Sequence, residues 1–369
     1  MFPRIEYLEW IEGRPAAALH DLAASDLRGD RDTGTAMPDI LADHADPPAG
    51  VSLETQLATL YGVDPEQVLV TAGASHANFL AVAAALDIAR EDGVASPRAL
   101  VETPGYEPLV KTPTGLGAAV DRVPRPAEDD YAIDPDRVAD AITDETAVVT
   151  ITNRHNPSGR RLDRGTLAET AAAVRAEGAR LLVDEVYAPY TRDPVGDGPF
   201  GGPTAAGLGD VVVTNSLTKF FGLGDVRIGW LVADADFVAR ARRVLGHVPT
   251  VAETGRALGR RTLHAREALV DRAQTLLAEN GTLLEAFVAD TPTIRGPVYD
   301  GATFAAIGHD TVGGDDLAAA AADAGILVVP GRFFGAPDRV RVSVGRSHRD
   351  CAASLEALAS VLEDLDSVP

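Results

Sequence analysis

The chain of 369 residues contains very little cysteine and lysine. Its one cysteine, Cys351, excludes an intramolecular disulfide, and no CxxC motif or His/Cys cluster indicates a metal site. No apolar run approaches the roughly 20 residues that a membrane helix needs. The first residues also lack the apolar stretch of a signal peptide. We therefore expect a cytoplasmic protein that binds no metal and no membrane.

Positive charge is also scarce. The chain has 33 basic and 55 acidic side chains, with a formal net charge of −22. Such a chain repels phosphate backbones, which argues against a general nucleic-acid binder. Two explanations for the acid excess remain open. One is a halophile-like protein in molar salt, where a Debye length of about 3 Å screens self-repulsion. The other is an ordinary acidic cytosolic protein from a GC-rich genome, which favours Arg over Lys.

Short apolar, β-branched runs alternate with helix-like segments through the first two thirds of the chain. This alternation predicts an α/β fold with a mainly parallel sheet and helices on both of its faces. The predicted strands are 68–70, 98–103, 147–152, 179–186, 210–215 and 226–233, and the main helices are 75–91, 164–177 and 234–244. The Pro/Gly-rich stretches 104–117 and 189–209 are predicted to be loops over a site.

The pattern changes after residue 245. A long helical stretch is predicted over about 250–291, and a final helix over 351–364. Strands are predicted between them at 301–308, 325–331 and 338–345. These segments are typical of a smaller α+β domain. We expect a large domain over 45–245 and a small domain formed by 1–44 and 246–369.

Ligands of open α/β sheets bind outside the carboxyl ends of the strands. Lys219 lies just past the strand 210–215, and the only other lysine is Lys111. A lysine that is kept where the chain otherwise uses arginine suggests an amine that must lose its proton. Attack on a carbonyl to form a Schiff base is such a case. A solvated loop lysine is the alternative, and it is our interpretation of Lys111.

Three other segments follow predicted strands. Asp184 ends the strand 179–186, where a buried carboxylate is costly unless it is paired. A cationic ring nitrogen would pair it, although a hydrogen-bonded aspartate at a strand end is common. Asn156 lies in an Asn-Pro-Ser-Gly turn and is either a turn residue or an amide donor. Gly73, Ala74 and Ser75 open a helix, which is either an anion site or a plain helix start.

Together these segments resemble a known family. TAGAS, TPGY, TNRHNPSG, VDEVY, SLTKFFGLGDVRIGW and RVRVSVG occur in the order found in class I/II aminotransferases of pyridoxal-phosphate fold type I, the aspartate aminotransferase-like superfamily. The resemblance covers about residues 50–345. It implies a seven-stranded-type sheet between helices, a smaller α+β domain, pyridoxal 5′-phosphate as cofactor, and a homodimer.

The resemblance also implies roles for single residues. Lys219 would form the Schiff base and move the substrate proton, while Asp184 would pair with the pyridinium nitrogen. Tyr187 and Asn156 would hydrogen-bond the ring oxygen O3′, and Tyr106 would stack on the ring. The predicted phosphate-binding residues are Gly73, Ala74, Ser75, Ser216 and Arg227. The predicted substrate-binding residues are Arg341, which would grip the α-carboxylate, and Asn156.

The activity implied is a ping-pong transfer of an amino group between an L-amino acid and a 2-oxo acid. The same core residues also serve lyases, decarboxylases and cyclising synthases, because substrate contacts decide which bond at Cα breaks. A regulatory protein without turnover is a third possibility. About 45 acidic-leaning residues precede the core, too few for the DNA-binding module that regulators of this family carry.

The sequence departs from the family pattern in its first 50 residues. The Tyr that should lie near 47–50 and reach the neighbouring subunit is missing. The small-domain glycine that contacts the substrate is expected within 26–34. An arginine for a second substrate carboxylate has only weak candidates, which are Arg14, Arg28, Arg31 and Arg332.

Overall fold

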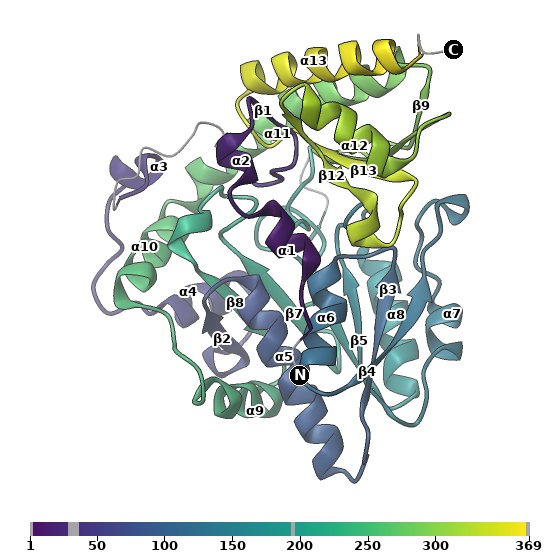
Figure 1. Ribbon diagram of the computed structural model, residues 1–369. Coiled ribbons are helices and arrows are strands. Elements are labelled where there is room, and N and C mark those ends of the chain that lie inside the picture. Colours follow the sequence, from purple (N-terminus) through teal and green to yellow (C-terminus); the bar gives the residue numbers. More distant parts are fainter. Residues whose placement is uncertain (1–2, 29–36, 193–195, 367–369) are drawn as a thin grey trace.

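A computed structural model describes residues 3–28, 37–192 and 196–366 of the chain. Its centre is a seven-stranded sheet (Figure 1). In spatial order the strands are β2 (Val68–Thr71), β8 (Gly229–Val232), β7 (Val211–Ser216), β6 (Arg180–Asp184), β5 (Thr146–Thr152), β3 (Arg98–Thr103) and β4 (Ala119–Pro124). The strands coincide with the predicted runs to within a few residues, apart from β4, which was not predicted.

One strand of this sheet runs against the others. β8 pairs antiparallel with both β2 and β7, whereas the pairs β7–β6, β6–β5, β5–β3 and β3–β4 are parallel. The carboxyl ends of six strands and the amino end of β8 therefore meet at one edge of the sheet. The predicted mainly parallel α/β fold is confirmed.

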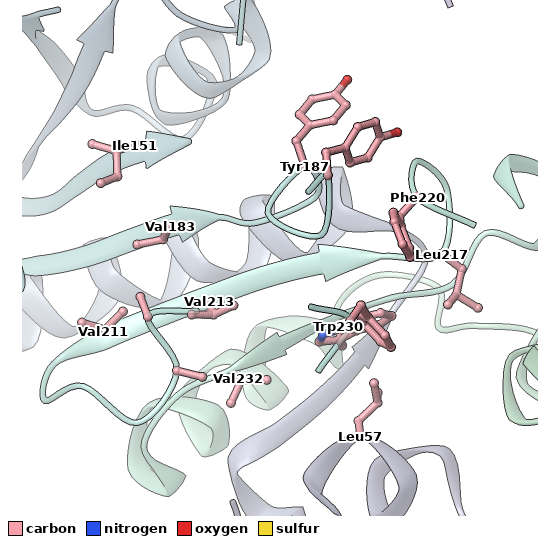
Figure 2. Close-up of a cluster of buried hydrophobic side chains, with 14 of the residues drawn as sticks. Leu57, Ile151, Val183, Tyr187, Val211, Val213, Leu217, Phe220, Trp230 and Val232 are labelled. Atoms are coloured by element: carbon pink, nitrogen blue, oxygen red, sulfur yellow. The ribbon is translucent and has the colours of Figure 1, made fainter. Parts of the chain in front are cut away.

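Helices cover both faces of this sheet because side chains alternate along each strand. Leu181 and Val183 of β6 face the helices α4 (Leu53–Tyr61), α8 (Arg164–Ala176) and α10 (Glu253–His264). Leu182 faces the helices α5 (Ala74–Glu91), α6 (Glu107–Gly115) and α9 (Ala235–Leu245). Figure 2 shows part of the first cluster, with Val183 and Val213 on neighbouring strands. The sheet is therefore a buried, rigid platform.

Residues 266–366 form a second sheet and the helices that pack around it. This sheet has the order β12 (Val329–Pro330), β13 (Arg339–Ser343), β10 (Phe304–His309) and β9 (Ile294–Arg295). The helices are α11 (Arg266–Asp290), α12 (Gly314–Asp323) and α13 (His348–Asp366), which lies across the top in Figure 1. The N-terminal segment joins this part, because β1 (His20–Asp21) pairs in parallel with β11 (Ile326–Leu327). The remaining helices are α1 (Glu6–Ile11), α2 (Arg14–Ala17), α3 (Asp39–Ala42) and α7 (Pro135–Asp140).

One sequence prediction about these elements was wrong. The stretch 104–117 is not a loop, because it contains helix α6. Pro108 lies in the first turn of α6, where a backbone N–H would have no partner within the helix. The proline therefore costs the helix no hydrogen bond, and a Pro-containing segment can still be helical. Lys111 therefore lies on a helix, with Nζ 3.8 Å from a carboxylate oxygen of Glu107. The helical stretch predicted over 250–291 is helical and consists of two helices, α10 and α11, that meet at Ala265.

Candidate active site

A cavity of about 380 Å³ lies at the edge where the strand ends meet. It is lined by ten of the eleven predicted site residues, which are Ala74, Ser75, Tyr106, Asn156, Asp184, Tyr187, Ser216, Lys219, Arg227 and Arg341. The eleventh, Gly73, directly precedes Ala74 and caps α5. The structure thus brings together residues from six separate segments of the sequence.

Lys219 stands just past the end of β7. Its carbonyl oxygen accepts hydrogen bonds from the N–H groups of Leu27 (2.9 Å) and Gly222 (3.1 Å), so its backbone is held from two sides. Burial disfavours the charge on the amine, but the combined effect of Tyr187, Asp26 and Tyr7 outweighs it, and the pKa of Lys219 lies above its ordinary value.

Asp184 is the last residue of β6 and is almost fully buried. Its Oδ2 accepts a hydrogen bond of 2.7 Å from Asn78 Nδ2, and its Oδ1 accepts one of 3.2 Å from the N–H of Val186. Burial raises the pKa of the carboxyl above its ordinary value, against the opposing effect of these donors. Such a carboxylate gains from a cation placed beside it.

The start of α5 lines the cavity through Ala74 and Ser75. Gly73 has φ +91°, a conformation that glycine adopts without strain, and α5 has no side-chain cap. Arg227 reaches across this turn, and its Nη2 donates to the carbonyl of Ala72 at 3.1 Å. A Cβ at Gly229 would lie 2.4 Å from the carbonyl carbon of Gly73, so only glycine lets β8 pass so closely. Free helix N–H groups beside a guanidinium suit a phosphate group.

Arg341 projects from β13 and is 2% exposed. Its Nη1 donates to Asn156 Oδ1 at 2.8 Å, and its Nη2 donates to the carbonyl of Ala23 at 3.0 Å. Its Nε is buried without a partner. These contacts fix the plane of the guanidinium and leave donor capacity for a carboxylate.

The N-terminal segment supplies site residues that sequence reasoning missed. Ser25 Oγ lies 2.6 Å from the hydroxyl oxygen of Tyr187, one residue before the region 26–34 in which a glycine was expected. Tyr7 lines the cavity, and its ring packs edge-on against Tyr106, with 5.8 Å between ring centroids. Its N–H donates to Glu107 Oε2 at 2.8 Å. No motif marks these residues, because they lie on short, irregular elements.

Tyr106 lies at the start of α6, and burial raises the pKa of its phenol. Its ring contacts the hydrophobic clusters on both sides of the cavity mouth. It is thus held by packing, as the predicted ring-stacking role requires.

Three candidates for a second substrate arginine, Arg14, Arg28 and Arg332, do not line this cavity. Arg28 pairs with Asp26 and Asp225, and Arg332 pairs with Asp315. Arg14 donates to the carbonyl of Trp10. Arg31 lies outside the described residues.

Comparison with known proteins agrees with this arrangement. The family model "Aminotransferase class I and II" matches residues 40–358. The chain belongs to the class I and II aminotransferase family. Its members use pyridoxal phosphate, so the cofactor prediction is confirmed.

Individual class I and II aminotransferases and their relatives show how wide this family is. The aromatic amino acid aminotransferase of Nocardia farcinica is 31% identical over 229 residues, which are 61% of this chain and 60% of that protein. The capreomycidine synthase of Streptomyces vinaceus is 29% identical over 270 residues, 71% of this chain and 68% of that protein. The crystal structure of a PLP-dependent aminotransferase from Streptococcus suis has a TM-score of 0.84 at 23% identity and covers all of both chains.

The residues around the cavity suit pyridoxal phosphate. The uncapped start of α5 is matched by its phosphate, and the buried carboxylate of Asp184 is matched by its cationic ring nitrogen. The unpartnered Nε of Arg341 is left for the carboxylate of a substrate. Within the described ranges, no helix has the length and apolar character needed to span a membrane. The same ranges contain no group of three or more His, Cys, Asp or Glu residues that could hold a metal ion.

Proposed function

We propose that this protein transfers the amino group of an L-amino acid to a 2-oxo acid by a ping-pong mechanism. The observation that carries the proposal is that Lys219, Asp184 and Arg341 face one cavity. An amine, an anion and a guanidinium placed together there serve covalent cofactor binding, ring-nitrogen pairing and carboxylate recognition respectively.

Pyridoxal phosphate, when bound, supplies an electron sink for negative charge at the substrate Cα. Asp184 would bind its ring nitrogen, and Tyr106 would cover one face of the ring. Tyr187 and Asn156 would donate hydrogen bonds to the ring oxygen O3′. The phosphate would be bound by Gly73, Ala74, Ser75, Ser216 and Arg227.

Lys219 would bind the cofactor aldehyde covalently and, once released by the substrate amine, move the proton at Cα. Arg341 would hold the substrate carboxylate by two parallel hydrogen bonds, which orients Cα toward the lysine. Because Arg341 is held by Asn156 and Ala23, this orientation is set before the substrate arrives.

The proposal is tested by mixing the cofactor-loaded protein with single amino acids. We expect stoichiometric release of the 2-oxo acid and conversion of the cofactor to its amine form, followed by return when a second 2-oxo acid is added. Lys219→Ala should abolish both the covalent absorbance band and this exchange. If Lys219→Ala retained near-normal exchange, the proposal would be wrong.

A second candidate is a lyase, decarboxylase or cyclising synthase, favoured by the similarity to the capreomycidine synthase. The same residues generate charge at Cα, and the bond that breaks depends on contacts beyond the core. Steady release of ammonia or carbon dioxide, or of a cyclised product, with no 2-oxo acid present would favour this candidate over the transaminase.

We also propose that the protein is a cytoplasmic homodimer, with the large domain over 45–245 and the small domain over 1–44 and 246–369. Arg227 lines the cavity and is nonetheless exposed in the single chain, which supports a partner that covers it. Light scattering that gave the 38.5 kDa of one chain at all concentrations would contradict the dimer. The halophile-like interpretation of the acidic charge also remains a proposal.

A further inference from the structure

Asn78, on the buried face of α5, links two strands of the large sheet. The hydroxyl of Thr214 on β7 donates to Asn78 Oδ1 at 2.6 Å, and Asn78 Nδ2 donates to Asp184 Oδ2 at 2.7 Å. Thr214, Asp184 and Asn78 are 0%, 4% and 5% exposed. The three side chains thus form a continuous hydrogen-bonded row shielded from water.

The direction of this row is fixed by chemistry. An ionised carboxylate can only accept hydrogen bonds, so the amide must turn its NH₂ group toward Asp184. The amide oxygen is then left facing Thr214, whose hydroxyl can donate to it. If the amide were reversed, its oxygen would face a carboxylate oxygen inside the core, where repulsion is strong. Asp184 therefore sets the amide orientation, and the hydroxyl of Thr214 satisfies the buried amide oxygen in that orientation.

Asp184 depends on such donors because burial opposes its charge. The titratable groups that interact with it are Lys219 after β7, Tyr106 at the start of α6, and the adjacent Glu185. Lys219 favours the charge on Asp184, whereas an ionised Glu185 or Tyr106 would oppose it. If Lys219 binds the cofactor covalently, its amine is no longer a free cation that favours the charge on Asp184. Asn78 does not react, so its hydrogen bond to Asp184 is kept.

We propose that Asn78 and Thr214 are positioning residues that keep Asp184 ionised and aimed at the ring nitrogen of the cofactor. The inference rests on the proposed function in assigning Asp184 to that nitrogen. Neither Asn78 nor Thr214 lines the cavity, so both act through Asp184 and not on the substrate.

The sharpest test is a matched pair at Thr214. Thr214→Val keeps the side-chain shape but removes the donor, while Thr214→Ser keeps the donor. Affinity for pyridoxal phosphate is measured on the full-length apoprotein across a range of pH. We expect Thr214→Ser to bind like the wild type and Thr214→Val to bind about tenfold more weakly at neutral pH. The difference should shrink as pH rises, because high pH ionises Asp184 without help.

Asn78→Leu removes the direct donor and should have the larger effect, about ten- to a hundredfold. Infrared spectra of the apoproteins give a second measurement that does not depend on turnover. At neutral pH we expect the band of a protonated carboxyl group to be stronger in Asn78→Leu and Thr214→Val than in the wild type. Its loss in the corresponding Asp184→Asn double variants assigns the band to Asp184. If Asn78→Leu does not fold, the Thr214 pair decides alone.

Two results would overturn the inference. One is equal affinity and equal pH dependence for Thr214→Val and Thr214→Ser. The other is an Asp184 infrared band that is the same in the variants and the wild type. A wild-type chain that binds pyridoxal phosphate but exchanges no amino groups would contradict the proposed function alone, since the affinities of the Thr214 pair still decide this inference.

Discussion

The two regions that meet at the cavity are built in different ways. At the edge of the seven-stranded sheet, each functional side chain stands at the end of a buried strand, as Asp184 does on β6. The N-terminal segment, residues 3–28, has only two short helices and a two-residue strand, yet Tyr7, Ala23 and Ser25 reach the same site. The sheet edge is thus the rigid part of the site, and the rest is assembled from segments distant in sequence. Under the proposed function, the first part would hold the cofactor and the second would hold the substrate.

The contacts between the two regions are few and specific. The N–H of Leu27 donates to the carbonyl of Lys219 at 2.9 Å, and the hydroxyl of Tyr190 donates to the carbonyl of Ser25 at 2.8 Å. Backbone groups make part of both of these hydrogen bonds, so side-chain motifs record little of them. The predictions below test whether the N-terminal segment tunes the chemistry or only supports it.

The largest effect is expected at Arg341, which belongs to the four-stranded sheet but is held by Ala23. Arg341→Leu should lower kcat/KM for the amino acid by about 100- to 1000-fold, because two charge-assisted hydrogen bonds to the substrate carboxylate are lost. Affinity for pyridoxal phosphate should change much less than kcat/KM, since Asn156 is the predicted cofactor residue that Arg341 contacts by a hydrogen bond and none of the predicted phosphate ligands depends on it. Steady-state kinetics and cofactor titration measure the two quantities.

Arg341→Lys is the matched control, because it keeps the charge without the planar fork. It should fall between the wild type and Arg341→Leu. A primary amine that lacks a carboxylate should react equally slowly with all three proteins. A large loss with that amine would mean that Arg341 maintains the fold of the site and does not recognise the carboxylate.

A second effect is expected on the rigid side, at Glu185. Its carboxylate accepts hydrogen bonds from the N–H of Ala205 (2.6 Å) and the hydroxyl of Thr204 (2.8 Å), and burial raises its pKa to about 8. The folded chain therefore binds a proton that the unfolded chain, with a pKa near 4.5, has already lost. The stabilisation is fully present below the unfolded pKa and is lost as pH rises through the window up to about 8.

Glu185→Gln removes this titration while preserving one acceptor and one donor. The free energy of unfolding of the variant should fall less between about pH 5 and about pH 9 than that of the wild type, by a few kcal/mol. Chemical denaturation at the two pH values measures it. Parallel pH profiles for the two proteins would show that Glu185 is ionised throughout in the folded chain.

The two regions also differ in how far the sequence predicted them. Apolar, β-branched runs indicate buried strands and the positions where those strands end. Such runs contain or directly precede Asp184, Lys219 and Arg341. Because neighbouring strands were predicted to be parallel, their carboxyl ends were expected at the same edge of the sheet. Arg227 precedes its strand, and the antiparallel direction of β8 explains why it still lies at the same edge.

The N-terminal segment's part of the site could not be predicted in this way. Ser25 and Tyr7 lie on elements too short for periodicity, and their positions depend on long-range contacts such as that between Tyr7 and Glu107. Asn78 was part of a correctly predicted helix, but α5 is Ala-rich and gave no sign that one polar residue on its buried face would meet Asp184. Local patterns predict elements, whereas hydrogen-bond partners depend on how those elements pack.

The smallest effect is expected at Ser25, and it decides the role of the N-terminal segment. Ser25→Ala removes one hydrogen bond to Tyr187, worth about 0.5–1.5 kcal/mol, and should lower kcat/KM about two- to tenfold. Ser25→Thr, which keeps the hydroxyl, is the matched control. In the Tyr187→Phe background the Ser25→Ala change should have no further effect, because the partner hydroxyl is already gone. Additive losses in this cycle would mean that the segment only supports the site, and that Tyr187 is oriented by the large sheet alone.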